Sequence, residues 1–176
     1  MTSFIELLKT RRSIRRFKAQ AVESEKIEWL KRALLSSPTG KHANDWEFVF
    51  VQNKDMLAKL SQTKEHGGEF VARAPLAVVI ASDTAKDDNT WVEDCSIAAF
   101  NLQLAAESMG LSSCWMQCRG RKRNDGSLCE DNVRALLNLP DNLGVLCIVA
   151  IGYKDEERKP FDWEKLQYEK IHEEKF

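Results

Sequence analysis

Two stretches of this chain are apolar at every position, and they constrain the fold more than any other feature. The first is Leu76–Ala81, which follows Pro75, and the second is Val145–Ile151, which ends at Gly152. A strand with one face in water alternates apolar and polar residues, and these runs do not alternate. We therefore expect Leu76–Ala81 in the middle of a sheet, buried on both faces, and Val145–Ile151 as the last buried strand.

The remaining elements alternate between helix and strand. Ser3 and Glu6 fit a capping box that opens a short helix reaching about Lys9, and Asn53 is placed to cap another short helix. Apolar spacing and helix-ending residues predict the other segments. The further predicted helices span residues 24–35, 92–109 and 127–139, the last ended by Pro140, and the further predicted strands span residues 47–51 and 113–116.

The predicted helix at 92–109 is rich in alanine and repeats apolar residues at three- and four-residue spacing. Its small side chains allow another helix to approach closely. That neighbour is either the same helix of a second subunit or an element of its own core, and the spacing fits both. The segment 153–176 is charged with scattered aromatic residues, so we expect it to lie over another surface, such as a partner subunit.

Charge and composition exclude several classes of protein. The 26 Lys and Arg residues balance 27 Asp and Glu residues, so no overall field attracts DNA or an anionic membrane. No apolar run approaches the roughly 20 residues of a membrane span, and the first residues lack a signal-peptide pattern. Five cysteines without a Cys-x-x-Cys pair fit free thiols in a reducing compartment, and the three histidines lack zinc-ligand spacing. We expect a soluble, cytoplasmic protein without a metal.

Four arginines and a serine lie within Arg11–Phe17, directly behind the first predicted helix. Guanidinium groups and a hydroxyl fit phosphate oxygens, although such clusters also form solvated faces or nucleic-acid contacts. The near-zero net charge and the lack of a nucleic-acid-reading motif argue against nucleic acid. Neither the Gly-x-Gly-x-x-Gly motif nor the P-loop motif is present, so a bound nucleotide would be held in another way.

Four motifs in this order resemble the FMN-dependent nitroreductase family over nearly the whole chain. The resemblance rests on Arg11–Phe17, on Ser37–Gly40 followed by Trp46–Val49, on the alanine-rich helix leading to Gly110–Trp115, and on Ala150–Tyr153. It implies a single α+β domain over residues 1–176, a three-layer α/β/α sandwich with a mainly antiparallel sheet, in an intertwined homodimer. The segment at about 153–176 would wrap the partner, and two FMN molecules would lie at the subunit interface.

The resemblance also assigns cofactor contacts. One subunit would hold the phosphate and the pyrimidine edge of the flavin with Arg11, Arg12, Ser13 and Arg15. The second subunit would bring a loop of small residues against the flavin, namely Pro38, Thr39 and Gly40. Backbone at Gln117 or Cys118 would face flavin N5. Arg158 and Lys159 fall where the family supplies a further cation, or they form an exposed charge run.

This sequence departs from the family pattern after the small-residue loop. Asn44 stands where a glutamine is common and retains hydrogen-bonding ability with a shorter reach. His42 would contact the flavin or substrate, or face solvent, and Asp45 replaces a proline. The segment 119–126 resembles an insertion whose four cations attract NADPH or an anionic substrate, or form a solvated loop.

The implied activity is hydride transfer from NADH or NADPH through flavin N5 to a nitroaromatic, a quinone or a related acceptor, with ping-pong kinetics. No catalytic acid or base is assigned, because the cofactor performs the chemistry. The physiological oxidant is not identified by the resemblance. The alternative is a flavin carrier or redox sensor without turnover, using Cys114 or Cys118.

Overall fold

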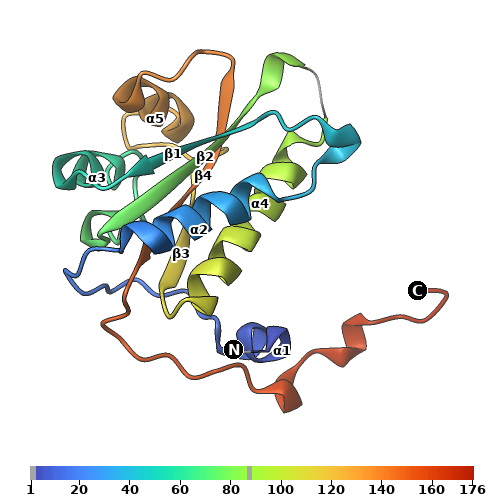
Figure 1. Cartoon of the computed structure of the whole chain (residues 1–176). Helices are drawn as coiled ribbons and strands as arrows, with labels where there is room; N and C mark the ends of the chain where they lie inside the picture. The colour runs from blue at the N-terminus through green and yellow to red at the C-terminus, as the bar shows by residue number, and fades with distance from the viewer. Residues whose placement is uncertain (1–2, 87–88) are drawn as a thin grey trace.

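The computed structural model describes residues 3–86 and 89–176, and its centre is a four-stranded sheet (Figure 1). The strands lie in the order β1-β2-β4-β3, and all three neighbouring pairs are antiparallel. Their bounds are β1 Trp46–Val51, β2 Leu76–Asp83, β3 Ser112–Gln117 and β4 Leu143–Gly152. The two apolar runs are therefore the inner strands β2 and β4, and every residue of β4 is buried, which confirms the prediction for both.

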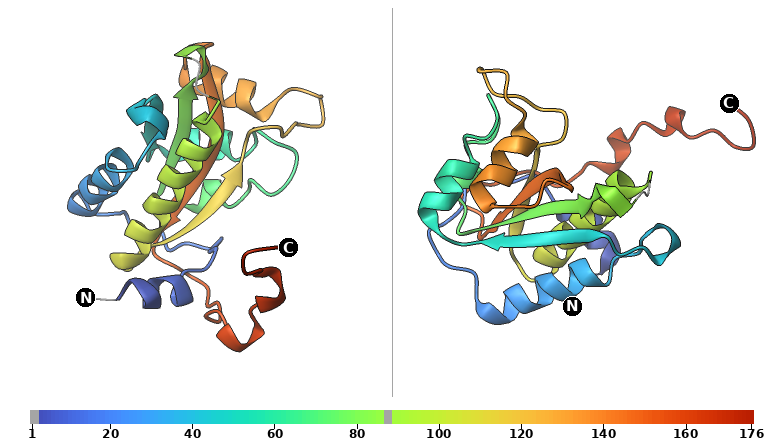
Figure 2. Two further views of the ribbon diagram at one scale, coloured as in Figure 1. Left: turned by 90° about the vertical axis from the view of Figure 1, so that its right-hand side faces the viewer. Right: turned by 90° about the horizontal axis from the view of Figure 1, so that it is seen from above.

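Helices cover both faces of this sheet. The α-helices are α1 Phe4–Thr10, α2 Ser24–Leu35, α3 Lys54–Leu60, α4 Trp91–Ser108 and α5 Cys129–Leu137. The 3-10 turns are η1 Gly40–His42, η2 Val71–Arg73, η3 Thr84–Lys86, η4 Trp163–Lys165 and η5 Tyr168–Lys170. Helices α2 and α4 pack on one face, and α3 and α5 lie on the other (Figure 2). This arrangement is the three-layer α+β sandwich that the resemblance implies.

The inner strands explain why two separate cores form. Successive side chains of a strand point to opposite faces. Val79 of β2 packs with the α3 and α5 side, whereas its neighbours Val78 and Ile80 pack with the α2 and α4 side. An antiparallel sheet can leave one face in water, but here two helical layers exclude water from both.

Helix α5 is shorter than the predicted 127–139, at both ends. Leu128 pairs with Lys122 in an isolated β-bridge, which holds the chain extended up to Cys129. At the other end Asn138 adopts a left-handed conformation, with φ of 52°, and ends the helix before Pro140. The predicted end at the proline was therefore wrong by two residues.

Helix α4 has one buried side and one exposed apolar strip. Cys95, Leu102 and Ala106 are buried against the sheet, and burial raises the pKa of the Cys95 thiol to about 12. On the other side Ile97 and Phe100 remain 42% and 43% exposed. The helix is thus a core helix of its own subunit that also carries an uncovered apolar surface.

The segment after β4 leaves the body of the molecule. Every residue from 157 to 176 is exposed, and Figure 1 shows this segment passing α1 and extending outward. A hydrogen bond of 2.9 Å from the Phe161 N–H to the Lys9 carbonyl ties its first part to α1. The segment therefore has no core of its own, and the prediction that it covers a partner subunit stays a prediction.

Two further observations concern the chain as a whole. All five cysteines are buried and free of disulfides. Over the part of the chain that the structure describes, no helix combines the length and the apolar character needed to cross a membrane.

Candidate functional site

The arginine segment, residues 11–17, lies along the edge strand β3 because its apolar residues anchor it there. Ile14 and Phe17 are buried, and the Ile14 N–H donates to the Ser113 carbonyl over 3.0 Å. Isolated bridges join Ser13 to Ser113 and Phe17 to Lys154. The polar residues between these anchors are left facing outward from the sheet edge.

Three of the predicted phosphate-binding residues converge on one point of β3. Burial raises the pKa of the Cys114 thiol, and the charges of Arg15 and Arg11 and a hydrogen bond with Ser13 oppose that rise. The charges of Arg11 and Arg15 are thus felt at Cys114, next to the Ser13–Ser113 bridge. Over the described residues, Arg11, Arg12 and Arg15 form no ion pair with a carboxylate, so their charges are available to a ligand.

A carboxylate that sequence reasoning missed holds this segment in place. Glu156 Oε1 accepts hydrogen bonds from the backbone N–H groups of Arg15, at 2.6 Å, and Arg16, at 3.1 Å. Its other oxygen lies 2.9 Å from a guanidinium nitrogen of Arg158. The Arg15 N–H is the main cause of the lowered pKa of Glu156, and Arg16 and Arg158 add to it. The only indication of Glu156 in the sequence was its position two residues before Arg158, a predicted phosphate-binding residue.

The other predicted cations have different surroundings. The Arg12 guanidinium lies over the Phe161 ring, 4.4 Å from its centroid, and Arg11 is 6.0 Å from the centroid of Phe100. Arg158 joins the site through Glu156. Lys159 is exposed, and within the described chain it forms no ion pair. The structure thus separates Arg158, which is tied to the arginine segment, from Lys159, which is not.

At the end of β3, Gln117 and Cys118 point in different directions. The Gln117 side chain accepts a hydrogen bond from Trp115 Nε1 at 2.9 Å and donates to the Arg119 carbonyl at 3.0 Å. Cys118 is buried, and a hydrogen bond with Cys129 raises its pKa while lowering that of Cys129 to about 7. Only Gln117 therefore presents its side chain outside the core.

A cavity of about 560 Å³ opens beside Arg15 and Gln117, and we call it the basic cavity. Its lining is Arg15, Lys64, Glu65, His66, Gly67, Phe70, Trp115, Gln117, Gly120, Arg121 and Lys122. Sequence reasoning missed the wall formed by residues 64–67. The Gly67-Gly68 pair was its only local signal, since paired glycines mark irregular backbone.

Gly68 anchors that wall by a close backbone approach. A Cβ atom at this position would lie 2.5 Å from the Ser61 carbonyl oxygen and 2.9 Å from the Met116 sulfur. Only a residue without a side chain fits there. The turn that carries Lys64 to Gly67 therefore depends on glycine.

The predicted small-residue loop, residues 38–40, and the predicted contacts that follow it, His42 and Asn44, lie elsewhere. Gly40 N–H donates to both carboxylate oxygens of Asp94, at 3.0 and 3.2 Å, in the first turn of α4. The Thr39 hydroxyl donates to Asn44 Oδ1 at 3.1 Å, while His42 is exposed. Figure 1 shows this loop near the N-terminal end of α4 and the arginine segment near the other end. Pro38, Thr39, Gly40, His42 and Asn44 are thus not brought to the arginine segment within one chain.

Comparison with known proteins identifies relatives of this arrangement. The sequence model described as the Nitroreductase family matches residues 8–66 and 58–153. An FMN-dependent nitroreductase from Clostridium difficile R20291 is 42% identical with a TM-score of 0.96, over 98% of this chain and 100% of that one. A Bacteroides thetaiotaomicron protein provisionally named NADH dehydrogenase/NAD(P)H nitroreductase is 31% identical with a TM-score of 0.87, over 98% and 97% of the chains. An Archaeoglobus fulgidus protein with the same provisional name is 29% identical over the full length of both chains.

Proposed function

We propose that this chain, which belongs to the nitroreductase family, is an FMN-dependent oxidoreductase that takes hydride from NADH or NADPH and passes it to a small organic oxidant. The names of its relatives support the cofactor and the donor. The observation that carries the proposal is the convergence of Arg11, Ser13 and Arg15 at the edge of β3, beside an open cavity. The acceptor class, a nitroaromatic or a quinone, is our inference from the family.

The residues present fit FMN. A phosphate is doubly charged near neutral pH, and the guanidinium groups of Arg11 and Arg12 lack carboxylate ion-pair partners among the described residues. Ser13 adds a hydroxyl beside them. Glu156 holds Arg158 beside the arginine segment in an ion pair that offsets its charge. The outer surface of β3 next to Gln117 then offers a place for a planar ring.

The chain's own groups have binding and electrostatic roles. Bound FMN would supply the hydride chemistry, accepting hydride from the donor and releasing it to the oxidant in a second step. We assign Arg15 to the pyrimidine edge of the ring, where its charge favours the reduced cofactor. No protein acid or base is assigned, so the site residues act by holding, orienting and shielding the reactants.

Replacing Arg15 with alanine is expected to weaken FMN binding and to lower the flavin's reduction potential. A fixed positive charge stabilises the negative charge that develops on reduction, and alanine removes it. The potential is measured by anaerobic titration against a reference dye, and Arg16→Ala serves as the control, since Arg16 contributes mainly backbone contacts. An unchanged potential with FMN fully bound contradicts this role for Arg15.

We further propose that two copies of the chain complete the site. The loop at 38–44 cannot reach the arginine segment of its own chain, but a second copy can supply it. The uncovered apolar strip of α4 and the exposed aromatic residues of the tail would then be buried. The segment at about 153–176 would wrap the partner, whose surface replaces the core that the segment lacks.

The variant Ile97→Asp is expected to convert a dimer into a monomer of 20.1 kDa and to release FMN. Burying an unpaired carboxylate in an apolar interface is strongly unfavourable. Sedimentation velocity measures the mass, and absorbance measures retained flavin. Leu128→Asp is the matched control, because Leu128 is also exposed but precedes α5 in the opposite layer. A dimer that persists in Ile97→Asp, or a monomer that keeps its FMN, argues against the composite site.

The central test is the visible spectrum of the purified protein before and after anaerobic addition of NADH and NADPH. Flavin absorption bands at about 370 and 450 nm that bleach when NADH or NADPH is added would support the oxidoreductase and identify its donor. Bands that persist with both donors would favour the flavin carrier. A colourless protein that FMN cannot reconstitute would refute the proposal.

A further inference from the structure

The basic cavity lies between two irregular segments at the free edge of β3. One wall is residues 64–67 and the other is residues 120–122. The Glu65 N–H donates to the Lys122 carbonyl over 3.0 Å and joins the two walls, while the bridge between Lys122 and Leu128 braces the second. Phe70 and Trp115 add apolar surface. The cavity is thus held by backbone contacts, so its cations are carried on fixed walls.

Four cations line this cavity, together with one carboxylate. Arg15, Lys64, Arg121 and Lys122 form no ion pair with a carboxylate among residues 3–86 and 89–176. The single carboxylate in the lining, Glu65, lies 3.2 Å from His66 Nε2. Like charges in one cavity repel one another, and an anionic ligand relieves that repulsion.

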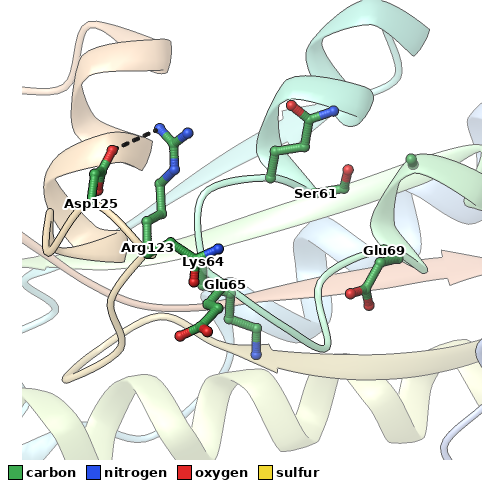
Figure 3. A pocket seen from close by; sticks show the side chains of 9 residues that line it. Ser61, Lys64, Glu65, Glu69, Arg123 and Asp125 are labelled. Atoms are coloured by element: carbon green, nitrogen blue, oxygen red, sulfur yellow. Dashed lines mark ion pairs between the residues drawn. The ribbon is translucent and has the colours of Figure 1, made fainter.

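The next cation along the same loop behaves differently. Arg123 pairs with Asp125 at 3.8 Å and lines a neighbouring cavity of about 520 Å³, which also contains Glu69 (Figure 3). That cavity mixes both signs of charge, with Lys64 and Glu65 also in its lining. The excess positive charge is therefore specific to the basic cavity and is not a property of the whole loop.

We propose that the basic cavity binds the phosphate groups of the pyridine nucleotide donor, with Lys64, Arg121 and Lys122 as its recognition residues. This inference rests on the proposed function, since it names how that site binds its donor. Lysine and arginine are the side chains suited to phosphate. The cavity adjoins Gln117, where we place the flavin ring, so a nucleotide held here by its phosphates keeps its nicotinamide end close to the ring.

The charge balance matches the diphosphate bridge that both donors share. Arg15 is assigned to the flavin, which leaves three cations for the nucleotide, and the Glu65 carboxylate in the same lining reduces their net charge to +2. A diphosphate bridge carries two negative charges. The recognition residues therefore bind the bridge of NADH and NADPH alike.

The test is the double variant Arg121→Ser with Lys122→Ser, purified with its FMN. We expect the Kd for NADP⁺, measured by calorimetry on the FMN-loaded protein, to rise roughly tenfold, which corresponds to about 1.4 kcal/mol. The anaerobic rate of flavin reduction should fall similarly at low NADPH and at low NADH. Arg123→Ser is the matched control and should match the wild type, because its charge is already paired with Asp125.

The outcomes separate this inference from the proposed function. An unchanged Kd in the double variant, or an equal rise in Arg123→Ser, overturns the assignment of the basic cavity. The assignment is also overturned if the double variant binds NADP⁺ normally but its reduced flavin is reoxidised more slowly when free FMN serves as the acceptor. In that case the basic cavity binds the phosphate of the acceptor. If neither NADH nor NADPH reduces the wild-type flavin, the proposed function is refuted instead, while NADP⁺ calorimetry still tests the cavity.

Discussion

Replacing Glu156 with alanine is expected to lower the affinity for FMN by roughly 100-fold. The carboxylate accepts two backbone hydrogen bonds from the arginine segment and anchors Arg158. Hydrogen bonds to charged groups contribute about 1.5–3 kcal/mol each. Losing two of them therefore removes at least about 3 kcal/mol of the free energy that keeps this segment ordered. Flavin fluorescence during titration measures the change in affinity.

Two further variants make this result specific. Glu156→Gln keeps an acceptor oxygen without the charge, so its affinity for FMN should lie between those of the wild type and Glu156→Ala. Glu157→Ala is the matched control, because Glu157 is the neighbouring exposed carboxylate and, among the described residues, forms an ion pair with Lys154 alone. Tighter binding of FMN in Glu156→Ala would contradict the prediction and show that the carboxylate competes with the phosphate.

The lowered pKa of Glu156 gives the same prediction a pH dependence. A carboxyl group whose folded pKa lies below its ordinary value of 4.5 contributes stability that is complete above that value and is lost as the pH falls through the folded pKa. The wild type should therefore lose order in the arginine segment, and FMN with it, on acidification below about pH 4.5. Glu156→Gln should lack this component of the acid transition.

The second large effect is expected for Gly68→Ala. The added methyl group would meet the Ser61 carbonyl oxygen at 2.5 Å, so the main chain has to move. Overpacking of this kind costs about 1–3 kcal/mol, which lowers Tm by roughly 3–10 °C in a domain of this size. The wall at 64–67 should shift as well, which weakens nucleotide binding. Thermal unfolding by circular dichroism measures the stability.

Gly67→Ala is the control for Gly68→Ala. Gly67 has φ of +73°, and the nearest atom to an added Cβ is Lys64 Nζ at 3.8 Å, an ordinary contact. That variant experiences only the strain of a left-handed backbone, about 1–2 kcal/mol. If Gly68→Ala unfolds at the temperature of the wild type, the close approach at Ser61 does not limit the fold.

The parts of the fold that the sequence predicts are those set by local pattern. Helix α2 spans Ser24–Leu35 as expected, and the Asn53 side chain caps α3 by accepting from Met56 N–H at 2.9 Å. The apolar run at Leu76–Ala81 lies in an inner strand because every position meets a covered face. The start of α5 was misplaced because the bridge between Lys122 and Leu128 depends on a tertiary turn, which periodicity cannot show.

The site was predictable only in part, for a related reason. Arg11, Ser13 and Arg15 are neighbours in the chain, so their motif indicated a shared role. Glu156 reaches them from 141 residues away along the chain, and no local pattern links it to Arg15. Lys64 likewise joins the basic cavity through a turn set by Gly68. The location of the loop at 38–44 relative to the flavin depends on a second copy and stays a prediction.

The contact between Arg15 and Glu156, which lie far apart in the sequence, also determines when the protein can bind FMN. Arg15 is translated long before Glu156 and Arg158, and at 5–20 residues per second the interval is on the order of ten seconds. A nascent chain therefore exposes its arginines without the carboxylate that orders them. We expect FMN to bind at full affinity only after Glu156 and Arg158 have joined the fold, so rapid overproduction should yield a mixture of empty and loaded protein whose proportion follows the cellular supply of FMN.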